Sequence, residues 1–294
     1  MRILEPNRLN LQKPDKNRRF KPGLVAFVMF AMISVLAWSL LKPKNLNTDS
    51  GFNTKNAEKK ELDLDIADIS NSLPVDTVKD TLRIFSDNEF KIFYDNLLQP
   101  NMMKVENPPV ISGNDIADAR IRKIAEDRGY RLRSSPAGDL ISIEGNMLQP
   151  QISPSWKSLK SAASKKGLTI TIVSGYRSVD EQRNLFLQRL SAAGTSIESV
   201  AAGKSDKQVD KVLITTSLPG YSKHHTGYTI DILCSGYAFE NFKNSPCSDW
   251  IIADNYAIAK ENGFIPSYPP SADAQGPDPE AWEYVWVGTD LLYE

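Results

Sequence analysis

The chain has 294 residues, with 35 lysines and arginines against 36 aspartates and glutamates, so its formal net charge is −1 and gives no reason to expect a nucleic-acid partner. Only two histidines and two cysteines are present, which excludes a three-histidine zinc site and a zinc finger. Any catalysis must therefore use carboxylates, hydroxyl groups, arginines and at most two imidazoles.

The first predicted element is a membrane anchor over residues 23–42. Gly23–Leu41 is a run of 19 residues without a charge. As a helix this run would be about 28 Å long, close to the thickness of the bilayer hydrocarbon. Lysine and arginine dominate residues 1–22, so the positive-inside rule predicts a basic cytoplasmic tail and export of everything after the anchor. A cleaved signal peptide and a buried helix are the alternative interpretations.

The exported part, residues 45–294, carries 26 basic and 34 acidic side chains, which gives it a net charge of −8. Its beginning is polar and lacks helical periodicity, so residues 43–77 are typical of a stalk. Residues 78–113 predict one or two short helices that lead into the main domain. That domain is expected over residues 114–294.

The main domain combines helical and alternating patterns, which indicates the α+β class. Helix starts are expected at the capping residues Asn114, Ser153, Ser178 and Ser248, and strands over residues 168–173, 228–233 and 282–287. We therefore expect a single domain with a small antiparallel sheet flanked by helices, preceded by one transmembrane helix.

Cys234 and Cys247 belong to the part of the chain that is expected outside the membrane. Disulfides form and persist in that oxidising environment, and closing the short loop between these cysteines would stabilise the fold by about 3 kcal/mol. We expect a disulfide here, with two buried free thiols as the alternative.

The candidate chemistry is concentrated in three segments, of which the middle one contains both histidines. His224 and His225 are neighbours, so their side chains should point apart and only one is expected to bind a metal. Asp231 follows on an apolar strand, where a buried carboxylate needs a cation or hydrogen-bond donors. This spacing fits a metal site, and it equally fits an aspartate bonded to backbone amides beside a surface histidine.

Together the three segments resemble the VanY-type zinc D-alanyl-D-alanine carboxypeptidases, which cut the peptide stems of bacterial peptidoglycan. The family pattern is S-G-Y-R-S, then S-x-H-x-x-G-x-x-x-D, then E-x-W-H. The first part is complete at Ser174–Ser178 and the second at Ser222–Asp231. The third has Glu280 and Trp282, but its final histidine is replaced by Glu283. The resemblance covers about residues 130–290 and makes the main domain a catalytic, peptidase-like one.

The resemblance implies a role for each matched residue. His224 and Asp231 would hold Zn²⁺, and Glu280 would be the general base that activates water. Arg177 would be the fixed positive donor for the carbonyl or terminal carboxylate of the substrate. The residues implied in substrate binding are Arg177, Ser178, Gln182 and Ser222.

Glu283 is the main departure from the family, because it stands where the second histidine ligand is expected. A carboxylate can also bind zinc, at about 2.0–2.2 Å. One imidazole and two carboxylates around a divalent cation give a formal charge of zero, whereas two imidazoles and one carboxylate give +1. Oxygen ligands also favour harder metals, so Mn²⁺ is a second expected cofactor.

These patterns lead to three hypotheses about function. The first is a carboxypeptidase of the bacterial cell membrane that hydrolyses peptidoglycan stem peptides through a metal held by His224, Asp231 and Glu283. The second is a catalytically silent domain that binds peptidoglycan without metal. The third is an endopeptidase that cuts another bond of the stem.

Overall fold

The structure is a computed structural model, and it describes residues 81–294. The expected tail, anchor and stalk lie outside the described residues. Within residues 81–294, none of the helices combines the length and the apolar character that crossing a membrane requires.

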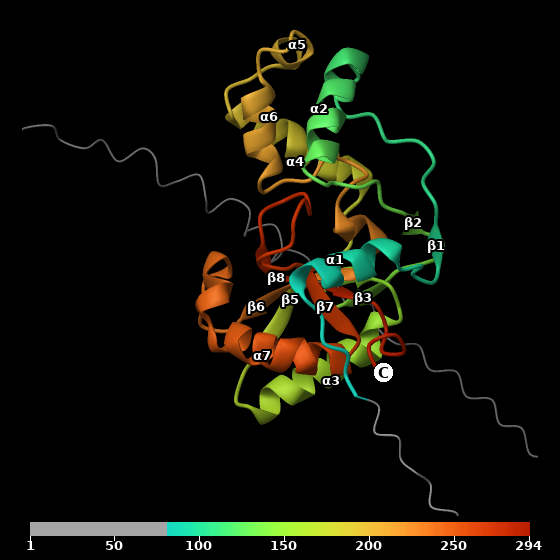
Figure 1. The fold of residues 1–294 in the computed structure, drawn as a ribbon, viewed down its shortest axis with the longest axis vertical. Coiled ribbons are helices and arrows are strands. Elements are labelled where there is room, and N and C mark those ends of the chain that lie inside the picture. Colours follow the sequence, from blue (N-terminus) through green and yellow to red (C-terminus); the bar gives the residue numbers. More distant parts are fainter. Residues whose placement is uncertain (1–80) are drawn as a thin grey trace, which may run out of the picture. The chain divides into compact units, whose positions relative to one another are not determined.

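A four-stranded antiparallel sheet lies at the centre of this part of the chain (Figure 1). In spatial order its strands are β5 (Ile170–Ser174), β6 (Thr229–Cys234), β8 (Glu280–Trp286) and β7 (Phe264–Tyr268). Two small antiparallel pairs accompany it, formed by β1 (Met102–Met103) with β2 (Ser135–Pro136) and by β3 (Ile141–Ile143) with β4 (Asn146–Leu148). Mixed helices and small antiparallel sheets are present, as the α+β class predicts.

Helices α3 (Ile152–Lys165) and α7 (Pro246–Glu261) pack on one face of the sheet (Figure 1). The main core contains alternate residues of β6, Ile230 and Ile232, which are fully buried. Because successive side chains of a strand point to opposite faces, Asp231 projects from the other face. A disulfide joins Cys234 at the end of β6 to Cys247 in the first turn of α7.

The segment before the main domain packs into the same core. Helix α1 (Asp87–Asn96) begins with a capping box formed by Ser86 and Glu89, and it buries Phe90 and Tyr94. The side chain of Asn255 in α7 accepts a hydrogen bond from the backbone N–H of Phe85 and donates one to its carbonyl. Residues 81–96 are therefore part of the packed domain.

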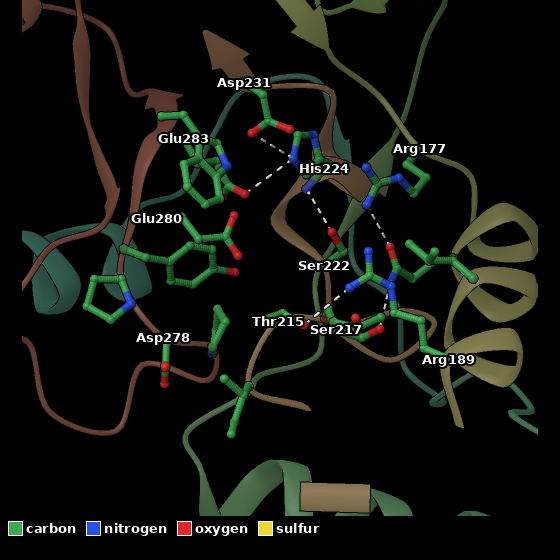
Figure 2. A pocket seen from close by; sticks show the side chains of 18 of the residues that line it. Arg177, Arg189, Thr215, Ser217, Ser222, His224, Asp231, Asp278, Glu280 and Glu283 are labelled. Atoms are coloured by element: carbon green, nitrogen blue, oxygen red, sulfur yellow. Dashed lines mark hydrogen bonds and ion pairs between the residues drawn. The ribbon is translucent and has the colours of Figure 1, made fainter. Parts of the chain in front are cut away.

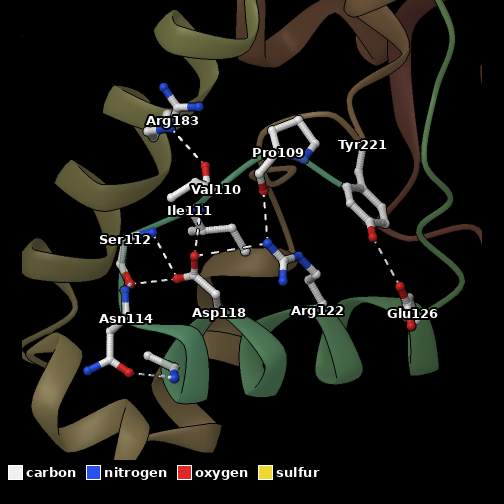
Figure 3. Close-up of polar contacts among 11 residues, drawn as sticks. Pro109, Val110, Ile111, Ser112, Asn114, Asp118, Arg122, Glu126, Arg183 and Tyr221 are labelled. Carbon is white, nitrogen blue, oxygen red and sulfur yellow. Dashed lines mark hydrogen bonds and ion pairs between the residues drawn. The ribbon is translucent and has the colours of Figure 1, made fainter. Parts of the chain in front are cut away.

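The remaining α-helices form a second group with its own apolar core. These helices are α2 (Asp115–Asp127), α4 (Val179–Ala192), α5 (Ile197–Ala201) and α6 (Asp206–Leu213). The strap 109–112 runs beside α2 and α4 (Figure 3), where Arg122 donates to the carbonyl of Pro109 and Arg183 to that of Val110. Two short 3₁₀ helices complete the fold, η1 (Lys223–Thr226) and η2 (Phe239–Asn244).

Two of the predicted caps are wrong. Helix α3 begins before Ser153, because the N–H groups of Ile152 and Ser153 bond to the preceding turn, and Pro154 is tolerated in a first turn that needs no N–H. Helix α7 is capped by Ser245, which accepts from the N–H of Ser248. The caps at Asn114 and Ser178 are confirmed.

Helix α7 is also interrupted within its length. Asp254, Asn255 and Tyr256 all have a left-handed backbone, so two short helical pieces meet here. The break lets the ring of Tyr256 contact Tyr284 of the sheet and Phe90 of α1. Strand β7 was not predicted, because it contains Pro266. It is an edge strand, where a proline is tolerated.

Candidate metal centre and substrate cavity

His224, Asp231 and Glu283 lie together at the sheet. One ligand atom from each residue can be chosen so that all three lie within 4.8 Å of one another. His224 Nε2 is 3.5 Å from Asp231 Oδ1 and 3.3 Å from Glu283 Oε2. Tetrahedral zinc ligands at 2.0–2.2 Å are separated by about 3.3–3.6 Å. The two distances therefore match the spacing of ligands around one cation.

The sheet register explains why the two carboxylates meet. Asp231 on β6 is the direct partner of Glu283 on β8, so both side chains project from the same face. On the other side of β6, an extra residue in β5 brings Ser174 opposite Asp231. A second irregularity, in β8, places Glu280 in the same cavity as Glu283, although a regular strand would direct residues three apart to opposite faces.

The imidazole of His224 is oriented for metal binding. Its Nδ1 lies 2.6 Å from the carbonyl oxygen of Gly175, which can only accept, so Nδ1 carries the proton. Nε2 is then free to offer its lone pair to the carboxylate side of the site. A backbone acceptor that fixes the tautomer in this way is typical of metal-binding histidines.

Asp231 has a buried carboxylate oxygen that accepts no hydrogen bond. Its carboxylate is buried, with 7% of the residue exposed, and Oδ1 has no hydrogen-bond partner. Oδ1 lies 3.5 Å from His224 Nε2, which is an ion-pair distance. Burying a carboxylate oxygen that accepts no hydrogen bond costs several kcal/mol unless a cation compensates. The residues present therefore fit a divalent cation.

The pKa shifts of the cluster also indicate a need for positive charge beside the carboxylates. Burial, reinforced by the nearby carboxylates of Glu283 and Asp231, raises the pKa of Glu280 to about 9. Burial alone would lower the pKa of His224, but the carboxylates of Asp231 and Glu283 raise it to about 10. Without a metal, the cluster thus compensates its negative charge by holding protons.

His225 points away from the ligand cluster. Its Nδ1 donates to the carbonyl of Arg177, and its Nε2 accepts from the N–H of Gly220, at 2.7 and 2.9 Å. Burial lowers the pKa of His225 to about 4, which keeps the ring neutral for both bonds. His225 therefore fastens the loop that carries Arg177 to the loop that precedes His224.

The ligand cluster opens into a cavity of about 290 Å³ (Figure 2). Three of the predicted substrate-binding residues line it, namely Arg177, Gln182 and Ser222. Arg177 donates to Gln182 Oε1 at 3.0 Å, and no acidic partner pairs with it among the described residues. Ser178 does not line the cavity, because its hydroxyl forms the capping box of α4 with Glu181.

The structure adds cavity residues that the sequence motifs did not predict. They include Arg189, Thr215, Ser217 and Asp278. Arg189 follows Leu185 and Gln182 on one face of α4, so the 3.6-residue period could have identified it. Its guanidinium donates to Thr215 Oγ1 at 3.2 Å (Figure 2). The cavity thus has two guanidinium groups on one side and carboxylates on the other.

This α+β domain therefore combines a candidate metal-binding group, formed by an imidazole and carboxylates, with a cavity wall that carries two guanidinium groups. The family comparison agrees, because residues 145–289 match the family model of VanY, D-alanyl-D-alanine carboxypeptidase. This part of the chain is therefore similar to the VanY family.

Two curated relatives match about half of the chain. The D-alanyl-D-alanine carboxypeptidase of Enterococcus faecalis is 25% identical over 147 residues, which are 50% of this chain and 50% of the relative. The putative carboxypeptidase YodJ of Bacillus subtilis is 29% identical over 150 residues, 50% of this chain and 48% of the relative. The chain spans about half the length of these curated relatives.

Solved structures show weaker similarity. The zinc complex of a vancomycin-resistance D,D-pentapeptidase VanY is 24% identical, with a TM-score of 0.40, and the match covers 53% of this chain and 84% of that one. The LdcB LD-carboxypeptidase is 21% identical, with a TM-score of 0.43. This match covers 67% of this chain and 90% of the LdcB chain.

Proposed function

We propose that the protein is a metal-dependent D-alanyl-D-alanine carboxypeptidase that hydrolyses peptidoglycan stem peptides. One observation carries the proposal: His224, Asp231 and Glu283 converge with their ligand atoms within 4.8 Å, while Asp231 Oδ1 has no hydrogen-bond partner. A divalent metal, Zn²⁺ or Mn²⁺, would act there as a Lewis acid that polarises the scissile carbonyl and lowers the pKa of a water molecule.

Glu280 is the proposed general base. It lines the same cavity as the three ligands, so it can take the proton of the attacking water and pass it to the leaving amine. Its pKa of about 9 results from burial and from the neighbouring carboxylates. A cation among those carboxylates lowers this pKa, so that Glu280 is ionised and able to accept a proton at neutral pH.

Arg177 is the proposed anchor for the substrate. Its guanidinium is held by Gln182 and by Ser174 Oγ, and it has no acidic partner among the described residues. A fixed guanidinium without a counter-ion is suited to bind a carboxylate through two hydrogen bonds. The terminal carboxylate of a stem peptide has the matching charge and shape.

The test measures D-alanine release from a stem pentapeptide by the full chain supplied with zinc or manganese. Wild-type protein should release D-alanine, and Glu280→Gln should lower kcat about 10²–10⁴-fold while metal binding persists. Glu261→Gln, an exposed glutamate at the end of α7, is the matched control and should leave kcat unchanged. Release of a longer fragment would identify an endopeptidase, and binding of peptidoglycan without any product would identify a silent binding domain.

The proposed location is the bacterial cell membrane, with a single span over residues 23–42 and the catalytic domain outside. This proposal rests on the uncharged run Gly23–Leu41 and on the basic residues before it. A reporter enzyme fused after Lys44 should be active outside the cytoplasm. A reporter that remains cytoplasmic would contradict the orientation.

A further inference from the structure

Ser267 is a buried hydroxyl on β7 that contacts the unusual ligand Glu283. Its Oγ donates to Glu283 Oε1 at 2.5 Å, and the two residues are 2% and 4% exposed. Ser267 lies where the pairing of β7 with β8 is irregular, between Pro266 and Tyr268. Pro266 pairs with Tyr284, so the next step of the same antiparallel register already places Ser267 opposite Glu283, directly before the shift at Tyr268.

The two carboxylate oxygens of Glu283 have different partners. Oε1 accepts the Ser267 hydroxyl, whereas Oε2 lies 3.3 Å from His224 Nε2, on the side of the ligand cluster. A carboxylate can bind a metal through one oxygen or through both. With Oε1 already engaged, Glu283 presents a single oxygen, as the imidazole expected at this position would present a single nitrogen.

The backbone that carries Ser267 is itself held in place. The ammonium of Lys223 donates to the carbonyl oxygen of Ser267. The same ammonium lies 4.0 Å from the ring centroid of Tyr268 and 4.5 Å from that of Tyr94. Lys223 is buried and immediately precedes His224 in η1. One side chain thus links the strand of Ser267 to the turn of the histidine ligand.

We propose that Ser267 is a positioning residue that makes Glu283 a one-oxygen ligand and thereby favours zinc over larger, more highly coordinated cations. This inference rests on the proposed metal-dependent function. Zinc prefers four ligands, whereas oxygen-rich sites with higher coordination suit Mn²⁺. Removing the Ser267 hydroxyl frees Oε1, so that both oxygens of Glu283 can bind the metal.

The test compares zinc and manganese affinities of the metal-free full chain by competition with a chromophoric chelator. Ser267→Ala should weaken zinc binding about 10–100-fold, which is the usual effect of losing a hydrogen bond to a metal ligand. Manganese binding should weaken less, so the ratio of zinc to manganese affinity should fall about tenfold or more. Ser267→Thr keeps the hydroxyl and should retain the wild-type ratio.

The ratio of zinc to manganese affinity distinguishes a positioning role of Ser267 from a loss of folding. A fraction of unfolded protein would reduce both apparent affinities by the same factor and leave this ratio unchanged. Ser205→Ala, another buried serine, is the matched control and should leave the ratio unchanged. An unchanged ratio in Ser267→Ala, with zinc still bound by wild-type protein, would overturn the role of Ser267 alone. A wild-type chain that binds neither metal would overturn both this role and the proposed function.

Discussion

Asp231 and Glu283 are direct cross-strand partners on β6 and β8, with both carboxylates on the same face of the sheet. Like charges in this position destabilise a sheet, and burial strengthens their repulsion. The neighbouring His224 is the nearest group that can compensate them, by taking up a proton or by sharing a metal. The proposed metal would relieve this repulsion by binding both carboxylates.

The first prediction concerns His225, which joins two loops through its two ring nitrogens. His225→Ala leaves the N–H of Gly220 and the carbonyl of Arg177 buried without partners. We expect the free energy of unfolding to fall by about 2–5 kcal/mol, measured by urea denaturation. His225→Gln keeps a hydrogen-bond donor and an acceptor, so its free energy of unfolding should fall less than that of His225→Ala. Equal stability of His225→Ala and wild type would refute this role.

The second prediction concerns Arg189, the second guanidinium of the cavity. Its only hydrogen-bond acceptor among the described residues is the neutral Thr215, so its charge is available to a substrate carboxylate. Arg189→Gln should raise KM for a stem pentapeptide about 10-fold or more while kcat changes little. Arg131→Gln, an exposed arginine outside the cavity, is the control. An unchanged KM in Arg189→Gln would exclude substrate contact.

The third prediction concerns acid stability and Asp118, which fastens the strap 109–112 to α2 (Figure 3). Burial alone would raise the pKa of Asp118, but hydrogen bonds from the Ser112 hydroxyl and from the N–H groups of Ile111 and Ser112 lower it. A lowered pKa stabilises the fold at every pH above the unfolded value near about 4. This stabilisation is lost as the pH falls through the folded pKa.

Asp118→Asn tests this prediction, because it cannot ionise. Its free energy of unfolding should be about 1–3 kcal/mol below that of wild type at pH 7, and the difference should shrink below about pH 4. Asp127→Asn, at the exposed end of the same helix, is the control and should leave the pH dependence of the free energy of unfolding as it is in wild type. A difference between wild type and Asp118→Asn that stays constant from pH 7 to pH 3 would contradict the assignment.

Much of the site could be predicted because its residues lie in short motifs with strong local signals. The strand around Asp231 alternates clearly, and Ser178 opens α4 with a capping box. The role of Ser178 shows the limit of this reasoning, since one hydroxyl cannot both cap the helix and line the cavity. A motif fixes which residues are present, but it does not fix which neighbour each side chain contacts.

The contacts that the sequence could not predict depend on long-range pairing. Ser267 lies in an edge strand whose proline obscures the alternating pattern, so its contact with Glu283 had no local signal. The hydrogen bonds of His225 join two loops that are distant in sequence, so they could not be predicted without the positions of both loops. Arg189 is different, because the helical period of α4 already places it beside Gln182.

His224, Asp231 and Glu283 are proposed to hold one divalent metal together. The most direct measurement is the metal content and zinc affinity of the purified full chain after removal and return of metal. We expect one zinc per wild-type chain and loss of that zinc in Asp231→Asn, whereas the exposed control Asp249→Asn should retain it. A wild-type chain that binds neither zinc nor manganese, or an Asp231→Asn chain that binds zinc as tightly as wild type, would contradict the proposal.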